Sequence, residues 1–171
     1  MKLPVFILFL FLSIQSQKTI AQDIDYRAYT LFVYNFMKYI EWPQTMNNQF
    51  TVGVYGDSPI LNELETLART KKVLGKTIVV KKLLTEQDAL SCQLVYVVSA
   101  KSALLKALAP LVDGKPVLVV CEREGLARKG AHFSFVTLED DQLKFDINKT
   151  AIEKNKLKVP AQLISLGFLV G

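Results

Sequence analysis

Two short segments of this chain are apolar at every position, and this pattern limits the folds that the chain can adopt. They are residues 94–98 and 117–121, and neither shows the alternation of a strand with one face in water. Strands that are covered on both faces are typical of parallel sheets. A helical segment at 102–108 lies between them, as in β-α-β units. We therefore predict an α/β fold, a three-layer sandwich with a mostly parallel central sheet and flanking helices.

Other predicted elements fit around this centre. Residues 50–55 and 77–80 have the composition of strands, and residues 24–40 have the apolar spacing of a helix. That helix is expected to end before Trp42-Pro43, because a residue that precedes proline is disfavoured in the helical region. Further short helical segments are expected after Pro59, at 85–90 and at 150–154.

The C-terminal part of the chain has a different pattern. Residues 132–137 and 143–147 alternate between apolar and polar side chains, with an acidic turn at 139–141 between them. This pattern predicts an antiparallel hairpin at the edge of the sheet, with one face in water. Residues 163–170 are apolar but too few to span a bilayer, and they favour a core helix.

The first twenty-one residues have the pattern of a secretory signal peptide. A lysine at position 2 precedes an apolar run at 3–12, and a small residue, Ala21, stands where cleavage is expected. The mature chain would then be residues 22–171, which we expect to form a single domain in the periplasm. Loss of Lys2 and Lys18 leaves 19 basic and 16 acidic side chains, a balance that does not favour a nucleic-acid partner.

Histidine and cysteine are too scarce for the common metal centres. The chain has one histidine, His132, and two cysteines, so we expect no metal and no cofactor. Cys92 precedes one predicted strand and Cys121 ends the next. If these strands are parallel neighbours, the two sulfur atoms lie at opposite ends, too far apart for the disulfide that export would allow. We therefore expect two buried free thiols.

A Gly56-Asp57-Ser58 turn after a strand invites comparison with GDS-type esterases, in which the serine is the nucleophile. Such a serine needs a histidine base, and His132 is expected to be a strand residue at the sheet edge. Ser58 is better explained as a helix cap. Five acidic residues are expected to lie in solvated turns: Glu122, Glu124, Glu139, Asp140 and Asp141. We predict that the protein is not an enzyme.

Seven aromatic residues occur within the seventeen residues from Tyr26 to Trp42. At helical spacing Tyr29, Phe32 and Phe36 share one face, whereas Tyr34 lies off it. A core helix with tyrosines at its border explains most of this pattern. The remaining side chains could contact a partner protein, because tyrosine and tryptophan are enriched in interfaces. The candidate contacts are Tyr34, Tyr39 and Trp42, with Asp57 and Ser58 as candidate ligand contacts.

Several segments, taken in order, resemble the YfiR family of exported bacterial proteins, which includes the HmsC proteins. They cover nearly the whole mature chain: residues 34–43, 52–59, 75–80, 92–99, 116–120, 145–148 and 157–159. The resemblance implies a non-catalytic periplasmic regulator. Such a regulator would bind the periplasmic sensor part of an inner-membrane diguanylate cyclase, hold it inactive, and so control cyclic-di-GMP and biofilm formation. It also implies self-association as a homodimer, and the membrane partner could instead be a sensor histidine kinase.

A small-ligand receptor is the alternative function. Ligands of open α/β sheets bind at the carboxyl ends of the strands, and Gly56-Asp57-Ser58 follows one predicted strand. A periplasmic binding protein would use this crevice for a small metabolite.

Overall fold

The computed structural model describes residues 25–43 and 48–171. The proposed signal peptide at 1–21 lies outside the described residues. The strands are β1 (Gln49–Tyr55), β2 (Lys72–Val73), β3 (Lys76–Leu83), β4 (Leu94–Val97), β5 (Leu118–Cys121), β6 (Phe133–Thr137), β7 (Leu143–Ile147) and β8 (Phe168–Leu169). The α-helices are α1 (Tyr26–Tyr39), α2 (Ile60–Thr70), α3 (Leu105–Val112), α4 (Lys149–Lys154) and α5 (Ala161–Ile164), and the 3₁₀ helices are η1 (Glu86–Ser91), η2 (Ser99–Leu104) and η3 (Ala127–Lys129).

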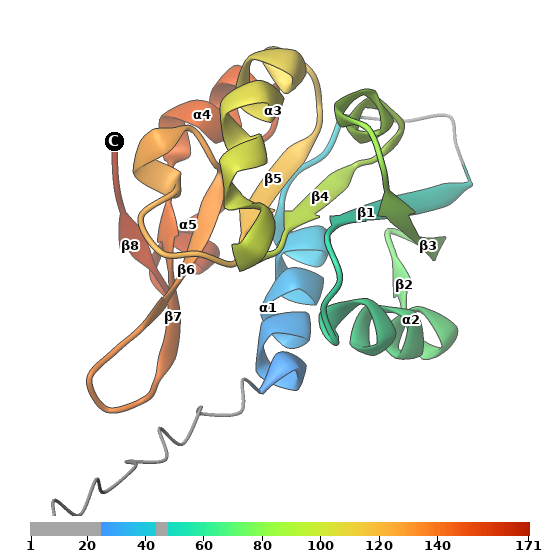
Figure 1. Ribbon diagram of the computed structural model, residues 1–171, viewed down its shortest axis with the longest axis horizontal. Coiled ribbons are helices and arrows are strands. Elements are labelled where there is room, and N and C mark those ends of the chain that lie inside the picture. The colour runs from blue at the N-terminus through green and yellow to red at the C-terminus, as the bar shows by residue number, and fades with distance from the viewer. Residues whose placement is uncertain (1–24, 44–47) are drawn as a thin grey trace, which may run out of the picture.

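All eight strands form one sheet, in the order β2-β3-β1-β4-β5-β6-β7-β8 (Figure 1). The five strands from β3 to β6 in this order are parallel, and both β2 and β7 run antiparallel to their inner neighbours. The α/β prediction with a parallel centre and an antiparallel C-terminal hairpin is therefore confirmed. Strand β8 adds a parallel pair beyond the hairpin, at Asp146–Phe168 and Ile147–Leu169.

The central strands supply side chains to two separate hydrophobic cores. In β4, Leu94 and Tyr96 face one core, and Val95 and Val97 face the other. All four side chains are fully buried. This arrangement explains why these strands are apolar at every position, because neither face of the sheet is in water.

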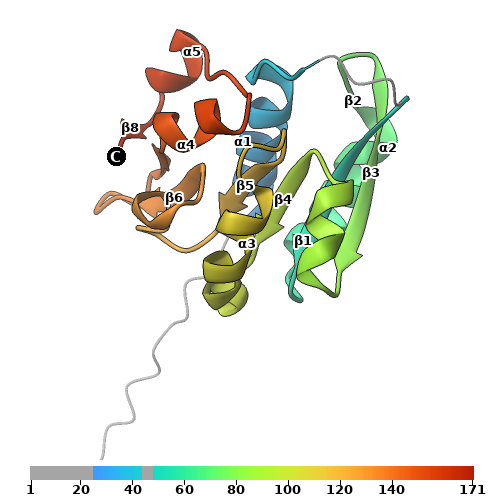
Figure 2. The same cartoon turned by 90° about the horizontal axis from the view of Figure 1, so that it is seen from above.

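Helices cover each face of the sheet. Helices α1 and α2 pack on the first core, through Phe36 and Leu64 among others, and α3 and η1 pack on the second, through Leu108 and Ala89. Figure 2 shows α1 and α2 on one side of the sheet and α3 on the other. The result is the three-layer arrangement that the sequence predicts.

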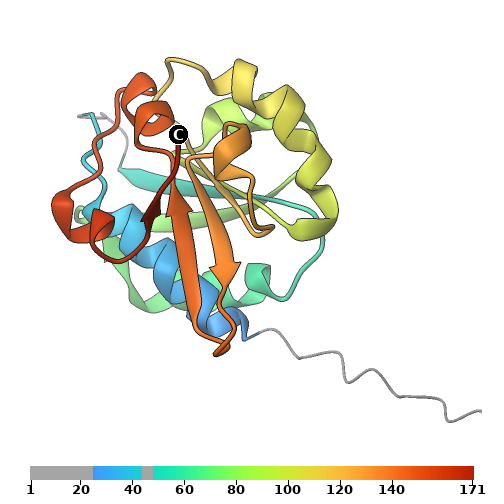
Figure 3. The same ribbon diagram turned by 90° about the vertical axis from the view of Figure 1, so that its left-hand side faces the viewer.

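Helix α1 is attached to the sheet by aromatic contacts. Its N-terminus is capped by Asp25, whose carboxylate accepts the Arg27 N–H at 3.0 Å. The Phe36 ring is fully buried and stacks on Phe133 of β6, with ring centroids 4.1 Å apart, and it meets Phe145 of β7 edge-on at 4.9 Å. Figure 3 shows α1 lying against the β6–β7 hairpin.

The prediction that this hairpin has one wet face is wrong. Ser134 is fully buried and Asp146 is 7% exposed, although both were expected to face water. The reason is the loop before β6, which folds over this face: the Ser134 hydroxyl accepts the backbone N–H of Ala127 in that loop at 3.1 Å. Only the tip of the hairpin is exposed.

A second hairpin, β2–β3, has no counterpart in the predicted elements. Its turn consists of Leu74 and Gly75, both with positive φ, 51° and 76°. Two-residue turns of this kind usually carry asparagine and glycine. Because leucine occupies the first position here, the sequence lacks the pattern that predicts a hairpin.

Residues 163–170 do not form the expected core helix. Helix α5 ends at Ile164, and the chain turns back through Gly167 to form β8 at the sheet edge, where Phe168 and Leu169 are about half exposed. A side chain at position 167 would meet the backbone oxygen of Phe145 at 2.5 Å, so only glycine permits this close approach. Hydrophobicity alone could not show that this segment ends as an edge strand.

The two cysteines lie as the strand order predicts. Strands β4 and β5 are parallel, with Val97 opposite Cys121, so Cys92 lies at the far end of β4. Both thiols are buried and free. Burial raises the pKa of the Cys92 thiol and raises that of Cys121 to about 12, so neither thiol is activated at neutral pH.

The stack on Phe36 gives a direct test of how α1 is held. Phe36→Ala should lower the free energy of unfolding by about 3–5 kcal/mol, since it removes a fully buried ring and leaves a cavity. Leu31→Ala is the matched control on the same helix, because Leu31 is 61% exposed, and it should change stability by less than about 0.5 kcal/mol. Urea unfolding of both variants measures this. Equal losses would show that α1 is not anchored through Phe36.

Candidate functional site

The carboxyl edge of the parallel sheet is the place where this fold would bind a ligand. From β1 the chain continues to β3 on one side, whereas from β4 it continues to β5 on the other. The topological switch point therefore lies between β1 and β4, and crevices form at such points outside the carboxyl ends of the strands. The residues that follow these strands include Asp57, Ser99 and Glu122.

Glu122 is the most unusual residue at this edge. It follows β5 directly and is 9% exposed, so the expectation that it lies in a solvated turn is wrong. Its Oε1 accepts the Tyr26 hydroxyl at 3.2 Å and its Oε2 accepts the Ser99 N–H at 3.3 Å. No basic side chain among residues 25–43 and 48–171 forms an ion pair with it. Burial raises the pKa of Glu122, and these hydrogen bonds oppose the rise only in part.

Three tyrosines surround this carboxylate. Tyr26 and Tyr29 come from the first turn of α1, and Tyr96 comes from β4. The Tyr96 ring is fully buried, and its hydroxyl lies close enough to Glu122 for hydrogen bonding to lower the pKa of the carboxyl, although no hydrogen bond within 3.5 Å to a described residue satisfies this hydroxyl. Burial, reinforced by the negative charge of Glu122, raises the pKa of Tyr96 well above its usual value. These hydroxyls are therefore neutral hydrogen-bonding groups at physiological pH.

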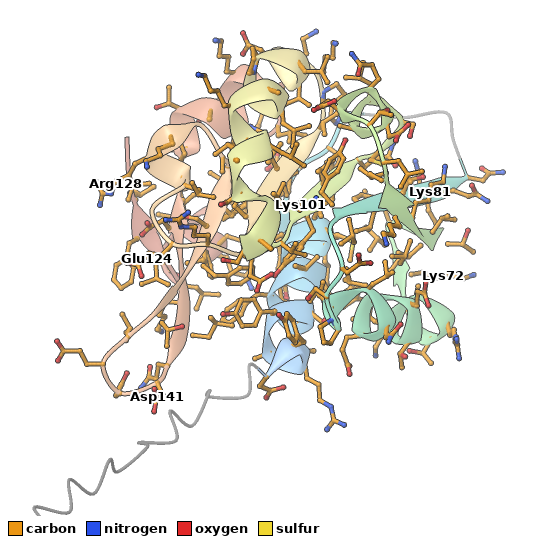
Figure 4. The ribbon with its side chains drawn as sticks, in the orientation of Figure 1. Lys72, Lys81, Lys101, Glu124, Arg128 and Asp141 are labelled. Atoms are coloured by element: carbon orange, nitrogen blue, oxygen red, sulfur yellow. The ribbon has the colours of Figure 1, made fainter. Side chains whose placement is uncertain are left out.

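A cavity of about 250 Å³ opens beside Glu122. It is lined by Tyr29, Ser99, Glu122, Arg123, Glu124, Phe135 and Thr137. The rings of Tyr29 and Phe135 form one wall, with centroids 4.5 Å apart. Glu124 lies on the loop that follows β5, as Figure 4 shows.

A larger cavity of about 550 Å³ lies next to it, between η2, α3 and the β5–β6 loop. Its charged lining residues, Lys106, Arg123, Glu124 and Lys129, are all exposed. This cavity contains no buried charged group that would select a ligand.

Asp57 and Ser58, the candidate ligand contacts, lie at the end of β1. Asp57 is exposed and pairs with Lys82, and this hydrogen bond, together with the charges of Lys82 and Lys101, lowers its pKa. Ser58 accepts the Ile60 N–H at 3.4 Å, which matches the predicted cap only weakly. Burial raises the pKa of Tyr26, and hydrogen bonding between Ser58 and the Tyr26 hydroxyl lowers it again in part.

The three aromatic candidates lie elsewhere on and after α1. The Tyr34 hydroxyl donates to the Lys72 carbonyl at 3.3 Å, and Lys38 lies over the Tyr39 ring at 5.0 Å. Trp42 donates to the Met37 carbonyl at 2.9 Å and packs edge-on against Phe50 at the start of β1. Trp42 is therefore at the opposite end of α1 from Tyr26, and the five candidates do not form one site.

His132 is not at the sheet edge, contrary to expectation. It immediately precedes β6, which pairs with β5 and β7, and it is 2% exposed. Its Nδ1 accepts the Val119 N–H at 2.7 Å, and its ring also bonds to the backbone of Ala151. Burial lowers the pKa of His132 to about 4, so the ring is neutral. A histidine held in this way cannot serve as base for Ser58, which removes the esterase hypothesis.

The comparison with protein families agrees with this architecture. A family model described as YfiR/HmsC-like matches residues 26–167. The chain belongs to the YfiR/HmsC-like family. No curated protein matches the chain. Within the described parts of this YfiR/HmsC-like protein, no helix is long and apolar enough to cross a membrane, and no group of histidine, cysteine or acidic side chains could hold a metal ion.

The raised pKa of Glu122 predicts a pH-dependent stability. A carboxyl whose pKa is higher in the folded state stabilises the fold only at low pH, and this contribution is lost as pH rises through the folded-state value. Glu122→Gln should therefore gain stability relative to the natural protein as pH rises above the ordinary glutamate range. Urea unfolding at a series of pH values measures this difference.

Glu124→Gln, an exposed neighbour on the same loop, is the matched control for loss of one carboxylate. It should change stability by less than about 0.5 kcal/mol. A loss of stability of Glu122→Gln relative to the natural protein as pH rises would contradict the burial of an unpaired charge at Glu122.

Proposed function

We propose that this protein is an exported, non-catalytic regulator that binds the periplasmic sensor part of an inner-membrane diguanylate cyclase and holds the cyclase inactive. Membership of the YfiR/HmsC-like family is the observation that carries this proposal. Release of the cyclase would raise cyclic-di-GMP and promote biofilm formation. The proposed signal peptide at 1–21 would place the mature protein in the periplasm, where it could reach such a partner.

The mechanism would be a shift between conformations of the partner. A regulator that binds the inactive state more tightly than the active state lowers the active population by the ratio of the two affinities. The described residues support a binding role rather than catalysis, because the one histidine is held by backbone groups and no activated nucleophile accompanies it.

The outer face of α1 is the contact surface that we propose. Leu31 is 61% exposed, and Tyr34 is half-buried one turn further along the same face. Tyr39, also half-buried, extends this aromatic surface. Partly exposed tyrosine side chains are typical of protein interfaces. Trp42 would contribute less, because its indole is already held by Met37 and Phe50.

We also propose that the protein forms a homodimer. The two edges of the sheet differ in a way that supports self-association. At one edge β2 is flanked by exposed lysines, Lys71 and Lys72, which discourage strand pairing. At the other edge β8 exposes the apolar side chains of Phe168 and Leu169.

A small-ligand receptor is the second candidate, and one observation favours it. The 250 Å³ cavity lies at the carboxyl edge of the sheet, beside the buried Glu122. It is lined by residues of α1, η2, the loop after β5 and β6 rather than by Asp57, which is exposed and paired with Lys82.

The regulator proposal is tested by crosslinked pull-down of the tagged mature protein from its own cell envelope. We expect one membrane cyclase to be enriched over a tag-only control. A Leu31→Ala, Tyr34→Ala double variant should reduce its recovery by about tenfold or more, because it removes side chains from the proposed interface.

Leu84→Ala is the matched control, since Leu84 is 83% exposed on another part of the surface. It should leave recovery unchanged. Enrichment of a sensor histidine kinase would support the regulator function, with the kinase rather than a cyclase as the partner. Absence of any enriched membrane protein would refute direct binding.

A further inference from the structure

The carboxylate of Glu122 is buried, and no basic side chain in the described part of the chain forms an ion pair with it. Its two described hydrogen bonds are long, 3.2 and 3.3 Å, and an ionised carboxylate can accept about four. A buried charge that is left unpaired destabilises the fold. An exposed, ion-paired or apolar residue at this position would not destabilise the fold in this way. The presence of glutamate therefore indicates a role in function rather than in stability.

Three basic side chains at the carboxyl edge of the sheet make their described contacts with other groups. Arg123 donates to the Ser102 hydroxyl at 3.4 Å, which draws its guanidinium toward η2. Lys101 and Lys82 both act on Asp57. Arg123 and Glu124 both line the cavity, so its rim carries one charge of each sign. The position that a cation would take beside Glu122 is therefore not filled by any of these side chains.

The remaining lining of the cavity suits a cation with an apolar body. Hydroxyls of Tyr29, Ser99 and Thr137 can accept hydrogen bonds, and the faces of Tyr29 and Phe135 can pack against hydrocarbon or a positive charge. A further hydroxyl, that of the fully buried Tyr96, lies close enough to Glu122 to lower the pKa of the carboxyl by hydrogen bonding, although no hydrogen bond within 3.5 Å among the described residues satisfies this hydroxyl. A volume of about 250 Å³ limits the ligand to a small molecule.

We propose that this cavity binds a small organic monocation, a primary ammonium group on a short apolar body. Glu122 is its counter-ion, hydroxyls of the cavity accept its remaining N–H groups, and Tyr29 and Phe135 pack against its hydrocarbon. This binding is a property of the purified protein and does not depend on the proposed regulator function.

The test is an NMR titration of the ¹⁵N-labelled mature protein with three probes of similar size: butylammonium chloride, 1-butanol and sodium butyrate. Butylammonium should bind saturably and shift the backbone amide of Ser99, which donates to Glu122. Butanol should bind at least about tenfold more weakly, since it lacks the charge, and butyrate should not bind at this site. These comparisons use the natural protein and do not depend on a variant.

Variants then assign the counter-ion. Glu122→Gln should weaken butylammonium binding about tenfold or more. Glu65→Gln, at an exposed position of α2 outside the cavity lining, should leave it within about twofold. Circular dichroism checks that both variants are folded. The proposal is overturned if butylammonium does not saturate, if butanol binds as tightly, or if folded Glu122→Gln binds butylammonium as well as the natural protein does.

Discussion

The parallel strands at the centre of this protein are apolar on both faces, and most of the structure follows from the need to cover them. The stack of Phe36 on Phe133, 4.1 Å apart and nearly parallel, fixes α1 over one face of the sheet. Phe145 closes the same cluster from β7. This contact joins the first helix of the described chain to strands that follow it by about a hundred residues, and so it connects the two ends of the fold.

The orientation of α1 has a consequence at the carboxyl edge of the sheet. Because its C-terminal half is held over β6 and β7, its first turn carries Tyr26 and Tyr29 to Glu122, at the end of β5. The same helix presents Leu31 and Tyr34 on its outer side. A change at the Glu122 cavity and a change at the proposed partner surface would therefore both act on α1. In the regulator that we propose, this helix is the element through which a bound ligand would change the affinity of the protein for its partner.

Much of the fold could be predicted from hydrophobic pattern, because the pattern records burial directly. Val95 and Val97 on one face and Leu94 and Tyr96 on the other require two covered faces, and the structure has them. The hydrophobic pattern gave wrong predictions where contacts between residues far apart in the sequence decide which side chains are buried. Ser134 is buried by a loop whose course no local signal reveals, and Gly167 is needed only because the backbone of Phe145 lies against it. Glu122 was missed for a related reason: a charged residue after a strand is usually solvated, and here α1 brings Tyr26 and Tyr29 over it from a distant part of the sequence. Its position directly after an apolar strand, at the predicted carboxyl edge, was the available signal.

In the function that we propose, this YfiR/HmsC-like protein holds a diguanylate cyclase inactive. The most direct test of this function is the cellular level of cyclic-di-GMP after deletion of the gene, measured by mass spectrometry, with complementation by the natural protein and by the Leu31→Ala, Tyr34→Ala variant. We expect the cyclic-di-GMP level to rise when the gene is deleted. Complementation with the natural protein should reverse this rise, and complementation with the variant should not. An unchanged level in the deletion strain, in cells where the protein is normally present, would contradict it.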